Sequence, residues 1–436
     1  MKSIEVISQN YLCTNCGACK AVCPKGSISF VYSNIGRMYA KVNHDLCVEC
    51  GLCQRVCPSL NFEELFLRNE DPFNGTILNT YIVRSSDSTI YDNAQSGGMC
   101  TTTIRYLFDK KLIDAAIVCL TEISNNPVPK AIVVRSAGQL KLTQKSNYTP
   151  VEMLSVLKEI DVSERVALVG LPCHIKASVL LAERIKKYNV IKYRLGLVCD
   201  RTLCNGINDV IASLSKLPKY KVVWRRKNFT FRGRYYSYKN APIVIVDGSN
   251  QERIIYPNNY RMVLKDMFTA PHCRICYDKA NVFSDIAYGD PWCLDEVDWN
   301  KGDSLVITRT EMGDRVMSNL IKEGFAANPR QTDTQKALDG QFIYEREEQF
   351  PLYINAFRLS QSSEIVDKIF RIVPSREGSF IEFAKNEFNQ FKKDEVLPKE
   401  IIIKKARSII KTEKRKMFID RCKSGIKKLI RIIIKK

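Results

Sequence analysis

The residues of this chain best suited to chemistry are its 17 cysteines, eight of which form two runs near the N-terminus. The first run is Cys13, Cys16, Cys19 and Cys23, followed by Pro24, and the second is Cys47, Cys50, Cys53 and Cys57, followed by Pro58. Three closely spaced thiolates can bind one face of an iron–sulfur cube, while the fourth cysteine of such a run binds the other cluster of a pair. The spacing therefore predicts one [4Fe-4S] cluster on Cys13, Cys16, Cys19 and Cys57, and a second on Cys47, Cys50, Cys53 and Cys23.

The two runs also predict a domain. CxxCxxCxxxCP is the ligand pattern of bacterial ferredoxins, so residues 1–62 are expected to fold as an α+β ferredoxin-like 2[4Fe-4S] domain. A pair of zinc sites is the alternative use of eight cysteines, but the doubled run ending in proline is typical of clusters. Two clusters this close together relay electrons, so substrate chemistry must lie further along the chain.

A shorter motif, CRIC at residues 273–276, supplies only two of the four ligands that a zinc ion or an iron–sulfur cube requires. Two apolar runs, 165–170 and 190–199, place a cysteine at or just beyond their carboxyl ends. Ligands of open α/β sheets bind outside the carboxyl ends of the strands, so these cysteines can reach one centre. The sequence predicts a third four-thiolate site from Cys173, Cys199, Cys273 and Cys276, with Cys204 as the alternative to Cys199.

Beyond the cysteine runs, the pattern is that of an α/β domain with a largely parallel sheet. Apolar runs at 113–120, 165–170 and 190–199 alternate with helical patterns at 101–110 and 174–187. The loop NAQSGGMC precedes the first of these helices, and Ser96, Gly97 and Gly98 in it would let an anionic or electron-rich ligand approach the backbone. The remaining cysteines considered, Cys100, Cys119, Cys293 and Cys422, are expected to be small buried residues.

The composition is that of a soluble globular protein, with 45% hydrophobic and 26% charged residues in 436. No apolar run approaches the ~20 residues needed to cross a bilayer, and the first residues, MKSIEVISQNYLC, show no secretory signal. We therefore expect a cytoplasmic protein, in which a disulfide framework is disfavoured because thiols stay reduced.

Basic residues are concentrated at one end of the chain. Residues 399–436 hold fifteen Lys or Arg and three acidic residues, which is +12 of the total charge of +20. Isoleucines and alanine at 401, 402, 406, 409 and 410 fall near helical spacing with lysines opposite, which predicts a basic amphipathic helix. Such a helix can rest on an anionic membrane surface at its inner face; a solvated docking arm for an acidic partner is the alternative.

A second basic stretch, WRRKNFTFRGRYYSYK at 224–239, interleaves cations with aromatic residues. Stacking on nucleic acid is one interpretation, but two strands around a turn at Gly233 explain the pattern more simply. No specific nucleic acid is expected as a partner. A further use would be to bind the phosphates of a cofactor, with Arg232 or Arg234 as candidates.

These patterns divide the chain into five parts. We expect the cluster domain at 1–62, a linker at 63–80, the α/β domain at 81–325, a helical extension at 326–395 and the basic amphipathic tail at 396–436.

The order of motifs resembles a known family. The ferredoxin pair is followed by SGG, VGLPC, LVC and CRIC, and then by SDIAYGDPW and GDSLVITRTEMGD. This order is similar to that of the coenzyme F420 hydrogenase/dehydrogenase beta subunits, over roughly residues 10–325. The resemblance implies a bound FAD and a family cluster on the third cysteine set. It also implies that Ser96, Gly97 and Gly98 lie against the flavin or its substrate, and that Gly289, Asp290 and Trp292 help to shape the flavin pocket.

The resemblance further implies an FAD- and [4Fe-4S]-dependent oxidoreductase that passes electrons between ferredoxin or another redox protein and an organic or deazaflavin substrate. A non-catalytic electron-transfer adaptor at the membrane surface is the alternative. One departure is His174, which stands where relatives usually have an amide residue. A histidine here is either a residue of the helix start or a proton donor beside the third cluster.

Overall fold

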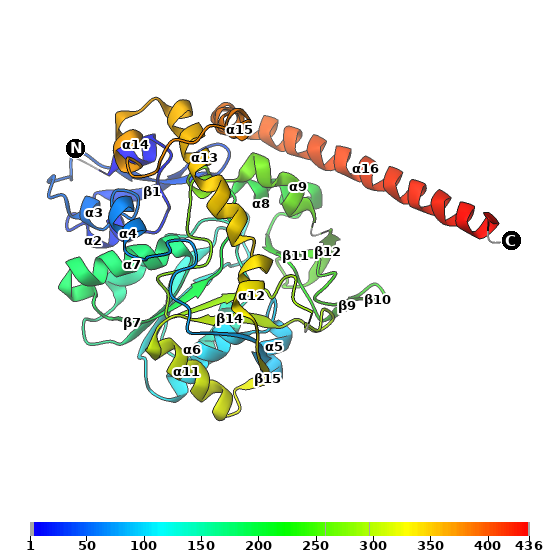
Figure 1. Ribbon diagram of the computed structural model, residues 1–436, viewed down its shortest axis with the longest axis horizontal. Coiled ribbons are helices and arrows are strands. Elements are labelled where there is room, and N and C mark those ends of the chain that lie inside the picture. The colour runs from blue at the N-terminus through cyan, green and yellow to red at the C-terminus, as the bar shows by residue number, and fades with distance from the viewer. Residues whose placement is uncertain (1–3, 258, 296, 435–436) are drawn as a thin grey trace.

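The computed structural model describes residues 4–257, 259–295 and 297–434, without the side chains of 417, 418 and 420–434. Figure 1 shows a rounded body from which one C-terminal helix projects. The N-terminal segment lies at one side of this body, against the helices that follow the main sheet.

The N-terminal domain is built on an antiparallel hairpin of β1 (Ile28–Tyr32) and β2 (Met38–Val42). Each cysteine run enters a short helix, α2 (Ala18–Val22) or α3 (Leu52–Arg55). The residue before each helix is a glycine in the left-handed region, with φ +85° at Gly17 and +72° at Gly51, a conformation that glycine adopts without steric cost. At Gly17 a Cβ would also lie 2.8 Å from the Glu152 carbonyl oxygen, so this run packs directly on the rest of the chain. Helix α1 (Glu5–Gln9) precedes the first cysteine run.

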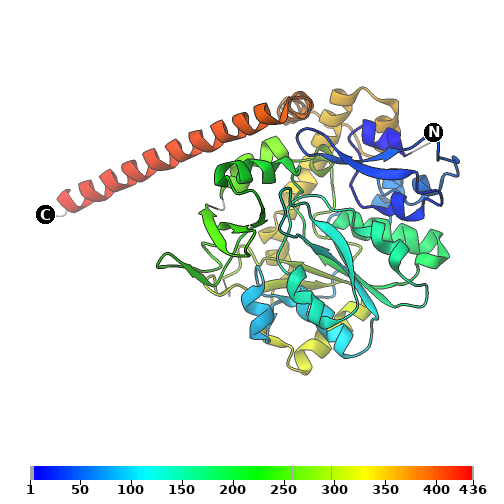
Figure 2. The same cartoon turned by 180° about the vertical axis from the view of Figure 1, so that it is seen from behind.

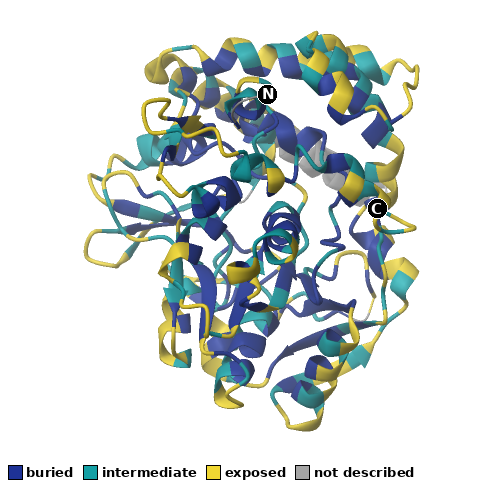
Figure 3. Cartoon of the chain, turned by 90° about the vertical axis from the view of Figure 1, so that its left-hand side faces the viewer, coloured by how far each residue is buried: buried dark blue, intermediate teal, exposed yellow. Residues whose placement is uncertain are grey.

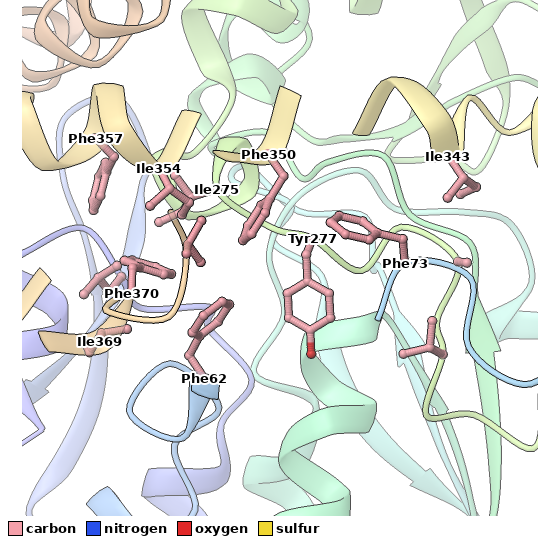
Figure 4. Packing of buried hydrophobic residues seen from close by; sticks show 14 of the residues in the cluster. Phe62, Phe73, Ile275, Tyr277, Ile343, Phe350, Ile354, Phe357, Ile369 and Phe370 are labelled. Carbon is pink, nitrogen blue, oxygen red and sulfur yellow. The ribbon is translucent and has the colours of Figure 1, made fainter. Parts of the chain in front are cut away.

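The expected linker at 63–80 is in part a packed helix, α4 (Phe62–Leu67). Phe62, Leu65 and Phe66 fall at i, i+3 and i+4, a short apolar stripe that the sequence interpretation overlooked. The Phe62 and Phe66 rings lie 5.8 and 5.1 Å from the ring of Tyr277. Figure 4 shows the side chains of Phe62, Tyr277 and Phe350 facing one another in this aromatic core. The segment therefore joins the N-terminal domain firmly to the rest of the protein.

The centre of the described chain is an eight-stranded mixed sheet of order β15-β3-β14-β13-β7-β6-β4-β5. The pairs β4–β6, β6–β7 and β7–β13 are parallel and the others antiparallel. The sheet is thus parallel across four central strands, with antiparallel strands on both sides. In chain order, the strands are β3 (Asn79–Ser85), β4 (Ala115–Leu120), β5 (Lys130–Val134), β6 (Val166–Gly170), β7 (Ile191–Leu197), β13 (Ile286–Gly289), β14 (Ser304–Thr308) and β15 (Ala326–Gln331).

Helices cover both faces of this sheet, as the almost entirely apolar central strands require. Helices α6 (Met99–Asp109) and α11 (Glu311–Lys322) pack on one face through a shared apolar cluster. Helix α7 (Pro172–Arg184) packs on the other face, where its cluster includes residues of α2 in the N-terminal domain. Figure 3 shows the buried residues concentrated in these strands and in the helix surfaces that face them. The carboxyl ends of β6 and β7 therefore lie close to the N-terminal domain.

A smaller unit is inserted between β7 and β13 and is seen from behind in Figure 2. It contains a three-stranded antiparallel sheet, two helices and a separate hairpin around Arg232 and Gly233, as expected for the basic aromatic stretch. Its elements are α8 (Gly206–Ser215), β8 (Tyr220–Val223), β9 (Phe229–Phe231), β10 (Arg234–Tyr236), β11 (Ile243–Asp247), β12 (Glu252–Tyr256) and α9 (Asn259–Phe268).

The extension expected to be helical from 326 begins instead with β15, which pairs with β3 at the sheet edge. The remaining elements are helical, and α13 and α15 pack against each other through Phe357 and Phe388. They are α12 (Thr334–Gly340), α13 (Ile343–Gln361), α14 (Glu364–Ile369), α15 (Phe380–Glu395) and α16 (Lys399–Ile434). Short elements elsewhere are α5 (Ser88–Asn93), η1 (Ala137–Thr143), η2 (Met153–Glu159), η3 (Lys186–Tyr188) and α10 (Pro271–Arg274).

Helix α16 forms as expected, but its apolar stripe is not free to meet a membrane. Ile402, Ala406 and Ile410 are at most 3% exposed and pack in the core cluster of α8 and α9. Ile401, by contrast, is 46% exposed. The expectation of a lipid-facing stripe is therefore wrong for the first turns, because the chain itself covers it. No described helix is long and apolar enough to span a bilayer; Cys422 lies outside the described side chains.

Candidate functional site

The structure gathers the eight N-terminal thiols into the same two sets that their spacing predicts. Cys23, Cys47, Cys50 and Cys53 line one small cavity of about 20 Å³. The other four thiols interact with one another. Burial first, then the charges of Cys16, Cys13 and Cys57, and last that of Cys53 from the neighbouring set, raise the pKa of Cys19. The fourth cysteine of each run thus joins the set of the other run.

The two sets differ in their access to solvent. Cys50 is exposed, and beside it Leu46 and Val48 are 50% and 56% exposed. Cys16 and Cys19 are at most 7% exposed. The first set therefore lies in the interior and the second at the surface, where a partner protein can approach it.

A third set of thiols lines a cavity of about 80 Å³, here called the four-thiol cavity. Cys173 lies in the first turn of α7 directly after β6, and Cys199 follows β7. Parallel strands end at a common edge, so these two thiols are brought together there. The segment around α10 supplies the other pair. The cysteines of the four-thiol cavity are Cys173, Cys199, Cys273 and Cys276.

One sulfur atom of this cavity, that of Cys273, has two hydrogen-bond partners on Thr202. The Thr202 backbone N–H donates to Cys273 Sγ at 3.3 Å, and Thr202 Oγ1 lies 3.2 Å from the same sulfur. Such donors stabilise thiolate sulfur and tune cluster potentials. Cys204, the alternative to Cys199, is fully buried in the core between α8 and α9 and does not line the cavity.

A buried lysine is the main charged feature of the four-thiol cavity. Lys176 is 6% exposed, and its Nζ lies 3.8 Å from Asp278 Oδ2 and 4.1 Å from the centre of the Tyr277 ring. Burial alone would lower the pKa of Lys176, but its electrostatic interactions with Tyr277, Cys276, Asp278 and Cys173 outweigh burial and raise the pKa. A permanent positive charge beside four thiolates offsets part of their mutual repulsion.

The first cysteine set borders the four-thiol cavity. Leu12, Thr14, Pro58 and Ser59, which flank that set in sequence, line the same cavity as Cys173. Among the causes that raise the pKa of Cys173, burial is largest and the charge of Cys16 comes next. The interior set of the N-terminal domain and the third set are therefore neighbours.

A larger cavity of about 310 Å³ lies at the carboxyl ends of the central parallel strands. This large cavity shares five wall residues with the four-thiol cavity, Leu171, Cys199, Asp200, Arg201 and Thr202. Its volume is within the range of small-molecule and cofactor sites, and its position is the usual one for ligands of α/β sheets. The two cavities are therefore adjoining compartments.

Of the residues predicted for the flavin, four line the large cavity: Ser96, Gly98, Gly289 and Asp290. Gly97 does not, because its backbone packs on β14, where a Cβ would lie 2.4 Å from the Ser304 nitrogen. Trp292 is also outside the lining; it is 37% exposed and stacks on Tyr238 and Trp299. Asp290 forms an ion pair with Arg225, whose guanidinium lies over the Trp292 ring. Trp292 thus supports the loop behind Asp290.

His174 occupies a helix-start position in the wall of the large cavity. Its Nδ1 accepts a hydrogen bond from the Leu171 backbone N–H at 3.1 Å. Burial lowers the pKa of His174 to about 4, which a hydrogen bond to the Val151 backbone only partly offsets. The ring is therefore neutral at physiological pH, and this geometry favours the structural role over the proton donor.

Sequence reasoning missed several polar residues of the site. Cys100 and Cys119, expected to be buried in the core, both line the large cavity, while Cys293 is exposed. The loop 143–149 supplies seven consecutive lining residues. Lys227, in the basic aromatic stretch, is fully buried and donates from Nζ to the carbonyl oxygen of Ser96 at 2.5 Å. No spacing pattern in the sequence marks these residues.

In the described part of the chain, no three His, Cys, Asp or Glu side chains converge as ligands of one metal ion. Cys23, Cys47, Cys50 and Cys53 line one cavity, and Cys173, Cys199, Cys273 and Cys276 line another. Four thiols around one cavity suit the corners of a multi-iron cluster.

The fold and the thiol sets together define an iron–sulfur electron-transfer protein built on an α/β sheet. The chain belongs to the family of coenzyme F420 hydrogenase/dehydrogenase beta subunits. Family models of the N-terminal and C-terminal parts of these subunits match residues 80–158 and 163–331. A 4Fe-4S dicluster domain matches residues 12–61, so two [4Fe-4S] clusters belong to the N-terminal domain.

Individual relatives are distant. The chain is 28% identical over 333 residues to one of the subunits of the F(420)H(2) dehydrogenase of Methanosarcina mazei, covering 74% of this chain and 86% of that one. It is 26% identical over 343 residues to the coenzyme F420-dependent sulfite reductase of Methanocaldococcus jannaschii, covering 74% of this chain and 48% of that protein. A chain of the solved, xenon-derivatised F420-reducing [NiFe] hydrogenase complex from Methanosarcina barkeri aligns with a TM-score of 0.47 and 19% identity, over 64% of this chain and 91% of that chain.

Proposed function

We propose that this iron–sulfur oxidoreductase is a flavoprotein that exchanges electrons between a ferredoxin-type redox protein and an organic substrate. Cys173, Cys199, Cys273 and Cys276 would hold a third [4Fe-4S] cluster, and the large cavity would hold FAD. Clusters exchange single electrons and a flavin exchanges two with an organic molecule, which is the chemistry these groups supply when bound.

The observation that carries this proposal is the continuity of the sites. The surface cysteine set, the interior set, the four-thiol cavity and the large cavity follow one another, and the last two share a wall at Cys199. An electron carrier alone requires no cavity of about 310 Å³ beside its thiols. The large cavity therefore favours an enzyme over the non-catalytic adaptor, and the covered stripe of α16 removes one reason to place the protein on a membrane.

The residues of the chain have separate roles in this proposal. Lys176 offsets the negative charge of the third thiol set. Lys227 holds the Ser96 carbonyl, and with it the SGG loop, in position at the large cavity. The buried aromatic core of Phe62, Tyr277 and Phe350 shields the four-thiol cavity from water, since Phe62 and Tyr277 also line it.

The deazaflavin coenzyme F420 is the substrate that the family supports best. The relatives include proteins named for their dependence on that coenzyme. Anaerobic oxidation of reduced F420 by the purified chain, with a ferredoxin as acceptor, tests this part of the proposal separately from cofactor content.

The decisive experiment is anaerobic purification with iron, sulfide and flavin quantified per chain. Three cubanes predict about twelve iron atoms, together with one FAD. Cys173→Ser should remove about a third of that iron and leave the N-terminal clusters intact. Cys204→Ser is the matched control, since Cys204 is buried nearby outside the cavity. A wild-type chain with about eight iron atoms and no flavin would contradict the proposal.

A further inference from the structure

We propose that the loop 143–149, which contains Lys145, and Arg261 form a phosphate-binding site in the wall of the large cavity. The ligand class is a phosphate-bearing molecule: either the nucleotide part of the flavin or a phosphorylated substrate. This site rests on the proposed function in one respect only, the assignment of FAD to the large cavity.

The loop is held open to the cavity by specific contacts. It connects η1 to η2, and all seven of its residues line the large cavity. Gln95 fastens it, because its Oε1 accepts from the Ser146 backbone N–H at 3.2 Å and its Nε2 donates to the Tyr148 hydroxyl at 2.9 Å. Lys145 itself has φ +84°, in the left-handed region that non-glycine residues rarely adopt. A strained residue held this firmly is typical of a binding site.

Positive charge around Lys145 exceeds negative charge. Its charged neighbours are Lys221 and Arg226, which lower its pKa, and Glu252, which raises it. Arg226 already pairs with Glu252 at 2.8 Å. Among the described residues Lys145 has no ion pair of its own, so the local excess of cations favours an anionic ligand.

Arg261 provides an independent indication of a missing ligand. Its guanidinium lies 4.2 Å from the centre of the Tyr148 ring, which places it beside the loop. Its Nε is buried and has no hydrogen-bond partner. A buried donor is normally satisfied, and an oxygen of a bound phosphate would satisfy this one.

The arginines first considered for this role are in the wrong place. Arg232 and Arg234 are exposed on the β9–β10 hairpin and do not line the cavity. Each guanidinium lies over an aromatic ring of its own hairpin, Phe231 or Tyr236. Replacing Arg234 therefore serves as a control, because it removes one positive charge from the inserted unit that also contains Arg261.

The test uses the full chain with its clusters, purified anaerobically and freed of flavin, as wild type and as Lys145→Gln, Arg261→Gln and the control Arg234→Gln. Dissociation constants are measured for FAD and for riboflavin, which lacks phosphate. Weakening of FAD binding by about tenfold or more, with riboflavin unchanged, supports the site and assigns it to the flavin phosphates. The control should behave as wild type.

Binding of inorganic pyrophosphate to the FAD-loaded chain tests the second possible ligand, a phosphorylated substrate. Unchanged FAD binding with pyrophosphate binding weakened about tenfold or more supports the site and assigns it to a substrate phosphate. If both site variants match Arg234→Gln for FAD and for pyrophosphate, the inference is overturned. A chain that binds no flavin contradicts the proposed function alone, because pyrophosphate titrated into the flavin-free chain still tests Lys145 and Arg261. Unchanged melting temperatures exclude misfolding as the cause.

Discussion

Replacing Lys176 by glutamine should make the proposed third cluster harder to reduce. The substitution removes a positive charge that is buried beside Cys173, Cys276 and Asp278. Reduction adds a negative charge to a group that four thiolates already make anionic, so a nearby cation favours the reduced form. Without it, the midpoint potential should become more negative.

The size of the effect follows from distances in the cavity wall. For the 3.8 Å between Lys176 Nζ and Asp278 Oδ2, Coulomb's law with an effective dielectric of about 20 gives about 4 kcal/mol. At three times this distance the energy is still about 1.5 kcal/mol, which is tenfold in an equilibrium constant and about 60 mV for a one-electron couple. Since Lys176 lines the cavity, we expect a shift of at least about 60 mV.

An anaerobic redox titration followed by electron paramagnetic resonance measures this potential, and loss of a signal in Cys173→Ser assigns it to the third cluster. Lys176→Arg, which keeps the charge, should retain the wild-type potential. Lys176→Gln combined with Asp278→Asn removes both charges and should recover most of the shift. An unchanged potential in Lys176→Gln, with full iron content, would refute the electrostatic role of Lys176.

Three further predictions concern other parts of the molecule. Lys227→Met should lower the affinity for FAD by about tenfold or more, because the Ser96 carbonyl loses a charged donor; equilibrium dialysis measures this, and equal affinity would contradict it. Burial and neighbouring cations lower the pKa of Lys145 to about 8, so its positive charge is present below that pH and lost above it. Affinity for the phosphate ligand should therefore fall as the pH rises through about 8. In Lys145→Arg, which keeps its charge, the affinity should stay level over the same pH range. Ile402→Ala should destabilise the protein by ~2–5 kcal/mol, whereas exposed Ile401→Ala should cost under ~0.5 kcal/mol; equal shifts in denaturant midpoint would show that α16 does not pack as described.

The sequence alone determined the N-terminal clusters. Three of the four ligands of each cluster are close neighbours in the chain, and glycines at 17 and 51 mark the required turns. The doubled run by itself indicates that the fourth ligand comes from the other run. The apolar runs that became β4, β6 and β7 were equally readable, since a central parallel strand is buried on both faces and needs continuous hydrophobic residues.

The convergence of Cys173 and Cys199 could also be predicted from the sequence, because the carboxyl ends of parallel strands meet at one edge of the sheet. The prediction that the apolar stripe of the C-terminal helix faces a membrane failed, because it depended on what that stripe packs against. The apolar stripe of α16 is indistinguishable in sequence from a membrane-binding one, and only its packing on α8 and α9 shows that it is covered.

Tertiary structure alone decided which charged residues belong to the site. Lys176 looks like any helix lysine until the fold buries it beside Cys173 of its own helix and Cys276 of a distant segment. Lys145 and Arg261 are more than a hundred residues apart, while Arg232 and Arg234 in a conspicuous basic stretch point to solvent. Charge and burial act through space, so contacts between distant segments settle what a pattern of neighbouring residues cannot.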